Sequence, residues 1–154
     1  SRETILKKLI EPIKSYYDYI IIDCAPSLGL LTLNALSSSD KLLIPVQCEY
    51  FALEGLGKLT ETVNLVQQRL NPKLKILGIV LTMFDRRTSL NRQVVRDAKE
   101  FFNSLIFTTI IPRNIRLAEA PSFGLPIALY EPKSSGSIAY YQLAKEVIDR
   151  VSTN

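Results

Sequence analysis

The sequence predicts an α/β protein with a mostly parallel sheet and flanking helices. Short apolar runs that do not alternate with polar residues are typical of strands buried on both faces of a parallel sheet. Between these runs lie segments whose apolar residues repeat every three or four positions, as in amphipathic helices. Strands alternating with helices indicate a parallel sheet with right-handed crossovers. At 154 residues the chain fits one domain, 1–154.

The first part of the chain supplies two strands and two helices. Apolar residues spaced by four, four and three positions predict a helix over 3–17, which Pro12 either kinks or restarts in a new first turn. Apolar runs predict strands at 19–23 and 41–46. The string "SLGLLTLNAL" between them begins a further helix.

The middle of the chain continues the alternation. The clearest amphipathic helix covers 56–70 and is stopped by Asn71-Pro72. A strand is expected at 75–83, followed by a helix over 89–105 with Ser89 as its N-cap.

The last part of the chain repeats the same order. A strand is expected at 105–111 and a final helix at about 137–151, with "PKSSGS" before it as a loop. In open parallel sheets, ligands bind at the carboxyl ends of the strands. The unusual residues of this sequence gather there: Asp23, Pro45, Asp85 and Pro112.

The composition is that of an ordinary globular protein, with 47% hydrophobic and 22% charged residues. There is no apolar run long enough to span a bilayer and no signal-peptide pattern, so a cytoplasmic location is expected. Cys24 and Cys48 lack CxxC spacing, and the chain has no histidine to complete a metal site, which favours reduced, packed thiols. The net charge of +4 says less than where the charges lie.

Asp23 follows the apolar run in "YDYIIIDCAPSLG" and has two interpretations. As a cap or turn residue it would accept backbone N–H bonds where the next helix begins. As a metal ligand it would hold a hydrated Mg²⁺, as the carboxylate after a central strand does in nucleotide hydrolases. Pro26 and Gly29 would then shape a loop that senses the terminal phosphate.

Four segments carry a resemblance to a known family. "YDYIIIDCAPSLGLLTLNAL", "LIPVQCEYFALEGLGKL", "GIVLTMFDRRTSLNRQV" and "IPRNIRLAEAPSFGLPIALYEPKSSGSIAYYQLAKEV" together resemble the ParA/Soj branch of the ParA/MinD partitioning ATPases. The resemblance implies a deviant Walker P-loop fold of the SIMIBI type. It also implies that Asp23 binds Mg²⁺ through water, and that Pro26 and Gly29 respond to the γ-phosphate of ATP.

The same resemblance places the adenine pocket at the end of the "LTMFD" strand and in the "IPRN" loop. The residues implicated are Met83, Asp85, Pro112, Arg113 and Asn114. The residues alone leave alternatives open: Met83 equally fits core filling, and a solvated surface position is the less favoured alternative for Arg113.

The phosphate-binding string of the family, K-G-G-x-G-K-[ST], is absent from these residues, as is the switch I aspartate. The glycines of "LEGLGKL" do not replace it, because they open a helix and are wrongly spaced. We therefore expect the chain to be the C-terminal part of a partitioning ATPase domain, and to be inactive by itself as an Mg-dependent ATP hydrolase. A naturally P-loop-less module that binds DNA or a partner without hydrolysis shares every residue discussed and stays open.

A basic run follows the third expected strand. Such a run is commonly a solvated helix face, but ParA-like proteins bind DNA non-specifically as ATP-bound homodimers, through phosphate contacts. The candidate DNA-binding residues are Arg86, Arg87, Arg92, Arg96 and Arg116.

The resemblance also implies a ParB-like partner that binds a centromere-like site, and association with the nucleoid. The chain ends without the basic amphipathic helix of the membrane-bound branch, so DNA is favoured over membrane. A phosphorelay receiver domain is disfavoured, because no acidic pair follows the first strand and no lysine follows the last. The residues do not distinguish a chromosomal from a plasmid system.

Overall fold

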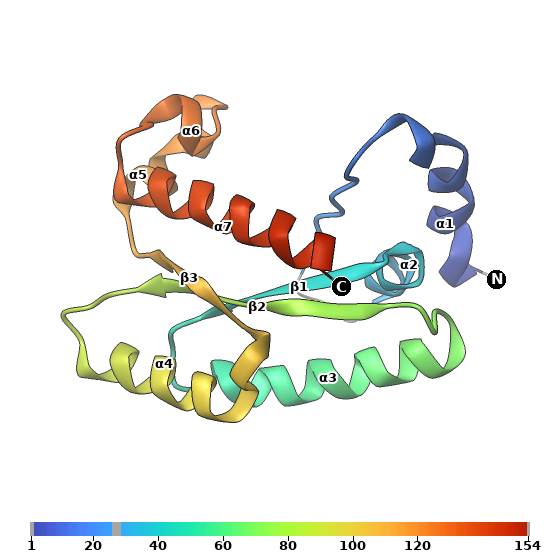
Figure 1. The fold of residues 1–154 in the computed structure, drawn as a ribbon, viewed down its shortest axis with the longest axis horizontal. Helices are drawn as coiled ribbons and strands as arrows, with labels where there is room; N and C mark the ends of the chain where they lie inside the picture. The colour runs from blue at the N-terminus through green and yellow to red at the C-terminus, as the bar shows by residue number, and fades with distance from the viewer. Residues whose placement is uncertain (1, 26–28, 154) are drawn as a thin grey trace. The chain divides into compact units, whose positions relative to one another are not determined.

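The computed structural model describes residues 2–25 and 29–153. It divides into two compact units, one within Ser1–Leu42 and Gly57–Ile76, the other within Leu43–Leu56 and Leu77–Asn154. The α-helices are α1 Ile5–Ile10, α2 Leu30–Ser38, α3 Ala52–Arg69, α4 Ser89–Phe102, α5 Ile115–Glu119, α6 Ile127–Tyr130 and α7 Ser135–Thr153 (Figure 1). The strands are β1 Lys41–Gln47, β2 Lys75–Phe84 and β3 Ile106–Pro112, and the 3-10 helices are η1 Arg2–Thr4, η2 Glu11–Tyr16, η3 Asn103–Leu105 and η4 Ala120–Phe123.

The strands form a sheet in the order β1-β2-β3, and β2 and β3 run parallel. Their register pairs Ile79 with Ile106 and Phe84 with Pro112, and it shifts on both sides of Leu81. The strands are joined by long helices, as the alternation in the sequence predicts. The carboxyl ends of β2 and β3 therefore lie at the same edge of the sheet.

The first unit is built around an apolar cluster between α2 and α3. Leu36, Val63, Val66 and Leu74 are buried there. Two buried asparagines hold the surrounding backbone: the Asn34 side chain bonds to Arg2, Leu6 and Leu30, and the Asn71 amide donates to the carbonyls of Leu36 and Ser39. Both asparagines are buried and join backbone segments that are more than 25 residues apart in the sequence, so both are structural.

The second unit packs helices on both faces of β2 and β3 (Figure 1). On one side, α7 covers a cluster of Leu77, Val80, Phe107 and Ile111. On the other, α4 buries Val94 and Ala98.

Arg150 of α7 lies over the Phe107 ring at 4.0 Å and donates to the carbonyls of Leu77 and Ile106. Gly78, with φ 158°, lies so close to this group that a Cβ atom would come within 2.5 Å of the Phe107 ring. The packing at this point therefore requires a glycine.

The predicted strand at 19–23 was wrong. These residues have no regular secondary structure, and Tyr19, Ile20 and Ile21 are exposed, Ile21 to 92%. A strand is stable only when its N–H and C=O groups pair with a neighbour. In the described part of the chain the sheet has three strands, and none of them is this segment.

Other differences concern the ends of helices. The helix predicted at 3–17 is divided at Glu11, where η2 starts with Pro12 in its first turn. The cap of α4 is Thr88, whose hydroxyl accepts the Asn91 N–H, and Ser89 is the first helical residue. Ser135, Gly136 and Ser137 belong to α7 rather than to the loop before it.

Two short helices were not predicted. The segment between β3 and α7 forms α5 and α6, each of at most five residues, too short for a helical repeat to show in the sequence. Among the described residues, no helix combines the length and the apolar character needed to cross a membrane.

Candidate functional site

The carboxyl ends of the three strands meet at one edge within the second unit. The Cys48 N–H donates to the Thr82 carbonyl, 2.9 Å, and the Arg113 N–H donates to the Phe84 carbonyl, also 2.9 Å. The first bond joins the end of β1 to that of β2. The second places the segment 83–85 beside the segment 112–114. All five residues assigned to the adenine pocket by resemblance are thus brought together; we call this set, Met83, Asp85, Pro112, Arg113 and Asn114, the strand-end set.

Met83 has an unusual backbone conformation. Its φ of 56° is in the left-handed region, which residues other than glycine seldom adopt. It lies where the β2–β3 register shifts, and its side chain is 41% exposed. Met83 is therefore not a core filler, and a strained backbone at a strand end is a feature of ligand sites.

Asp85 is fixed by its neighbours. Its carboxylate accepts the Arg87 guanidinium through three contacts of 2.7–3.3 Å, and Oδ1 also accepts the Arg87 N–H at 3.0 Å. These hydrogen bonds lower the pKa of Asp85 to about 2, so the group is ionised at neutral pH.

Asn114 also has a structural role. Its Oδ1 accepts the Arg116 N–H and caps α5, while its Nδ2 donates to Ser135 Oγ at 2.7 Å. Pro112 is half-buried, and Arg113 is exposed. Because the Asn114 and Asp85 side chains are already bonded within the protein, a base at this edge would meet mainly backbone groups and the exposed Met83 and Arg113 side chains.

Asn91 was missed by sequence reasoning. Its Oδ1 accepts the Asp85 N–H at 2.6 Å, and its Nδ2 donates to the Cys48 carbonyl at 2.8 Å. One side chain of α4 thereby joins the ends of β1 and β2. An asparagine in the first turn of a helix, just after a strand-end aspartate, was the only available signal.

Asp23 is exposed and is not the cap of α2. The N-cap residue is Gly29, and the helix begins at Leu30. The cap interpretation of Asp23 is therefore not supported in the described residues. Pro26 lies outside the described residues. No cluster of three or more metal-ligating side chains occurs in the described part of the chain.

The two cysteines differ in exposure, and both are free thiols. Cys24 is exposed, so the prediction of a packed thiol is wrong for this residue. Cys48 is buried as predicted, and burial raises the pKa of its thiol to about 11. Cys48 is therefore a protonated, packed residue.

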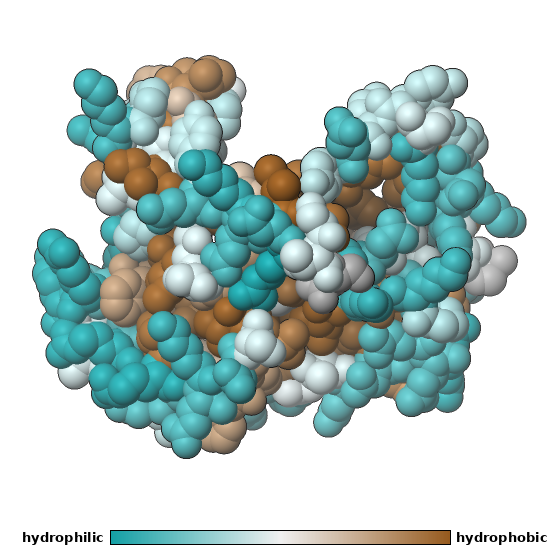
Figure 2. Space-filling view, viewed as in Figure 1, coloured by the Kyte–Doolittle hydropathy of each residue, from teal (hydrophilic) through white to brown (hydrophobic). Residues whose placement is uncertain are grey.

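The candidate DNA-binding arginines lie on α4, on the loop before it and, for Arg116, on α5. Arg92, Arg96 and Lys99 are spaced by four and three residues, and thus line one face of α4, opposite the buried Val94 and Ala98. Figure 2 shows hydrophilic residues gathered over α4. Arg86 and Arg87 precede the helix and are exposed.

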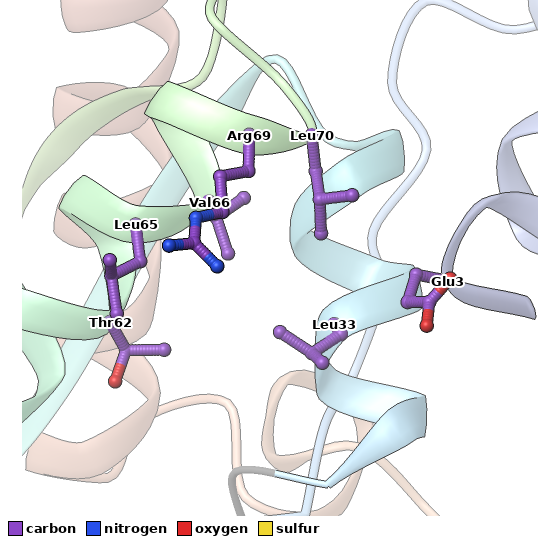
Figure 3. Close-up of a pocket in the computed structure, with 7 residues that line it drawn as sticks. All are labelled: Glu3, Leu33, Thr62, Leu65, Val66, Arg69 and Leu70. Carbon is purple, nitrogen blue, oxygen red and sulfur yellow. The ribbon is translucent and has the colours of Figure 1, made fainter. Parts of the chain in front are cut away.

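A separate pocket lies in the first unit, between α2 and α3. Its volume is about 300 Å³, and the Arg69 side chain projects into the space between the two helices (Figure 3). Its lining residues are Glu3, Leu33, Thr62, Leu65, Val66, Arg69 and Leu70. None of the predicted site residues is among them.

Comparison with known proteins identifies the chain's relatives. A protein-family profile described as an AAA domain matches residues 1–76. The chain is 58% identical over 147 residues to the sporulation initiation inhibitor protein Soj of Bacillus subtilis, covering 96% of this chain and 58% of that protein. It is 55% identical over 150 residues to the chromosome partitioning protein ParA of Myxococcus xanthus, covering 97% and 53%.

A solved structure is also similar. The cobyrinic acid a,c-diamide synthase of Mycobacterium smegmatis, with bound ATP analog and magnesium, superposes with a TM-score of 0.79 at 36% identity, over 94% of this chain and 53% of that one. The predicted fold class is thereby confirmed. The chain spans a little over half the length of these relatives, and within that span it belongs to the ParA/Soj branch of the ParA/MinD partitioning ATPases.

Proposed function

We propose that the chain is part of a ParA/Soj-type ATPase that segregates chromosome or plasmid DNA. It would do so by ATP-dependent dimerisation and non-specific DNA binding, with a ParB-like partner stimulating hydrolysis. The observation that carries the proposal is the identity of 58% to Soj over 96% of the chain. The meeting of 83–85 with 112–114 at one sheet edge supports it, because ligands of parallel sheets bind at such edges.

The residues present fit the nucleotide. At the strand-end set, Met83 combines a left-handed backbone with an exposed side chain, and the exposed Arg113 would be able to stack on a base. Asp23 presents an exposed carboxylate, and Mg²⁺ commonly takes only one or two carboxylates, completing its shell with water and phosphate oxygens.

Mg-ATP supplies an activated phosphoryl group for in-line attack by water. In this chain Asp23 would orient the hydrated metal, and Gly29, at the start of α2, would allow the loop to follow the terminal phosphate. The arginines on and beside α4 would neutralise DNA phosphates without reading base sequence.

Steady-state ATP hydrolysis by the full-length natural protein, with DNA present, tests the enzymatic half of the proposal. Asp23→Ala should reduce kcat at least about a hundredfold, since it removes a metal-orienting group from a reaction that depends on charge stabilisation. Asp18→Ala, an exposed aspartate five residues earlier, is the matched control and should hydrolyse ATP normally.

The second candidate is a DNA- or partner-binding module without hydrolysis, which would use the same basic residues. A full-length natural protein that binds DNA but shows no hydrolysis above background would establish it. Equal activities of the Asp23→Ala variant and the wild type would remove Asp23 from the proposed site.

A further inference from the structure

Two of the five candidate DNA-binding arginines are held by carboxylates. Arg116 Nη1 lies 2.8 Å from Glu119 Oε2, three residues along α5, and Arg87 Nη2 lies 2.7 Å from Asp85 Oδ2. The other three candidates form no ion pair in the described part of the chain: the Arg92 guanidinium donates to the Arg86 carbonyl, and that of Arg96 to Gln93. The basic surface therefore contains arginines of two kinds.

The Glu119 carboxylate stays ionised at neutral pH. The same oxygen that pairs with Arg116 also accepts the Tyr130 hydroxyl at 3.0 Å. The Tyr130 ring stacks on Phe123 with centroids 4.9 Å apart, which fixes the hydroxyl. The hydrogen bonds from Arg116 and then Tyr130 lower the pKa of Glu119, so the carboxylate is a permanent anion at neutral pH.

Asp85 holds Arg87 by a fork of contacts. Both carboxylate oxygens face the guanidinium, and the Asp85 side chain is only 19% exposed whereas that of Arg87 is 85% exposed. The acid is thus the more buried partner of the pair. A DNA phosphate approaching Arg87 or Arg116 offers acceptor oxygens like those of the carboxylate that already pairs with each arginine.

Resting on the proposed DNA-binding function, we propose that Glu119 and Asp85 are built-in counter-anions that compete with DNA phosphates for Arg116 and Arg87. They hold the affinity of the surface below what its arginines would otherwise give. Each exposed ion pair is weak, so a DNA phosphate can displace the carboxylate from the arginine. The expected effect on DNA affinity is therefore small, but within the range that a binding titration measures. The surface is thereby suited to reversible, non-specific contact rather than permanent attachment.

Glu119→Gln tests the proposal, because glutamine keeps an acceptor for Tyr130 and removes the charge. Fluorescence anisotropy of the full-length natural protein with Mg-ATP and a random-sequence duplex should show a roughly two- to fivefold lower Kd, matching the usual strength of such pairs. The salt slope should steepen by up to about 0.9 per freed arginine. Glu100→Gln is the matched control: it makes the same charge change on α4, at an exposed residue without an ion pair in the described part of the chain.

The arginine itself completes the test. In an Arg116→Ala background, Glu119→Gln should give no gain in affinity beyond that of Glu100→Gln, because the competed group is gone. An equal gain from Glu119→Gln and Glu100→Gln, or a gain that survives Arg116→Ala, would overturn the proposal and leave only a general charge effect. Failure of the wild-type protein to bind DNA would instead refute the proposed function.

Discussion

Replacing Asn91 with alanine should destabilise the full-length protein by about 2–3 kcal/mol. The substitution removes two part-buried hydrogen bonds, to the Asp85 N–H at 2.6 Å and to the Cys48 carbonyl at 2.8 Å. Each such bond contributes about 1 kcal/mol, and a backbone group left unpaired adds a desolvation cost. The two strand ends that it joins would also lose their common anchor.

Asn91→Asp separates the two bonds. The carboxylate still accepts the Asp85 N–H but has no proton for the Cys48 carbonyl, so two oxygens face each other. We expect a loss of at least about 1 kcal/mol from this isosteric change. Gln93→Ala, two residues along the same helix, is the control and should stay within about 0.5 kcal/mol, since its side chain bonds to the exposed side chains of Asp97 and Arg96 on the same helix.

The assay is urea unfolding followed by circular dichroism, with the slope m compared among variants. The reasoning requires a lower midpoint at constant m for Asn91→Ala and Asn91→Asp. If Asn91→Asp unfolds at the wild-type midpoint, the Cys48 bond contributes nothing. If Asn91→Ala does so as well, the side chain does not anchor this edge.

Two further predictions concern the second unit. Gly78→Ala should destabilise the protein by about 3 kcal/mol, because the new Cβ would lie 2.5 Å from Phe107 and 2.7 Å from the Leu105 carbonyl. Gly55→Ala in α3 is the control, because a Cβ there would meet no atom within 4 Å. It should be neutral or stabilise the protein by up to about 1 kcal/mol in the same unfolding assay. The pKa of Asp85 is lowered from 3.8 to about 2, so the stability it contributes is present above about pH 4 and is lost as the pH falls to about 2. Unfolding free energies measured between pH 5 and pH 2 should therefore fall less steeply for Arg87→Ala than for the wild type, and parallel curves would contradict the role of this pair.

The sheet and the long helices were predictable because their signals are local. The apolar runs of β1, β2 and β3 and the three-four repeat of α3 each indicate an element from neighbouring residues alone. The run at 19–23 has the same composition as the true strands, yet it is not a strand, because a ladder partner is a property of other segments. The composition of 19–23 is therefore suited to a strand, but a strand forms only where a neighbouring strand pairs with it.

The candidate site was predictable in part. Strand-end positions and the resemblance together indicated the strand-end set, and the structure brings 83–85 and 112–114 side by side, which leaves their role in nucleotide binding a prediction. Neither Asn91 nor Glu119 could be selected from the sequence, because their importance lies in partners such as the Cys48 carbonyl and the Tyr130 hydroxyl. The left-handed backbone of Met83 likewise depends on the shifted β2–β3 register.

The most direct test of the account is the DNA affinity of the full-length natural protein, with and without Mg-ATP, over a range of salt concentrations. The account predicts binding that requires Mg-ATP and weakens steeply with salt, with a slope that falls by about 0.9 for each phosphate-contacting arginine replaced by alanine. Arg92→Ala and Arg96→Ala should each show this fall, whereas Arg69→Ala, in the pocket of the first unit, should not. DNA affinity that is indifferent to Mg-ATP, or a salt slope that the α4 arginines leave unchanged, would contradict it.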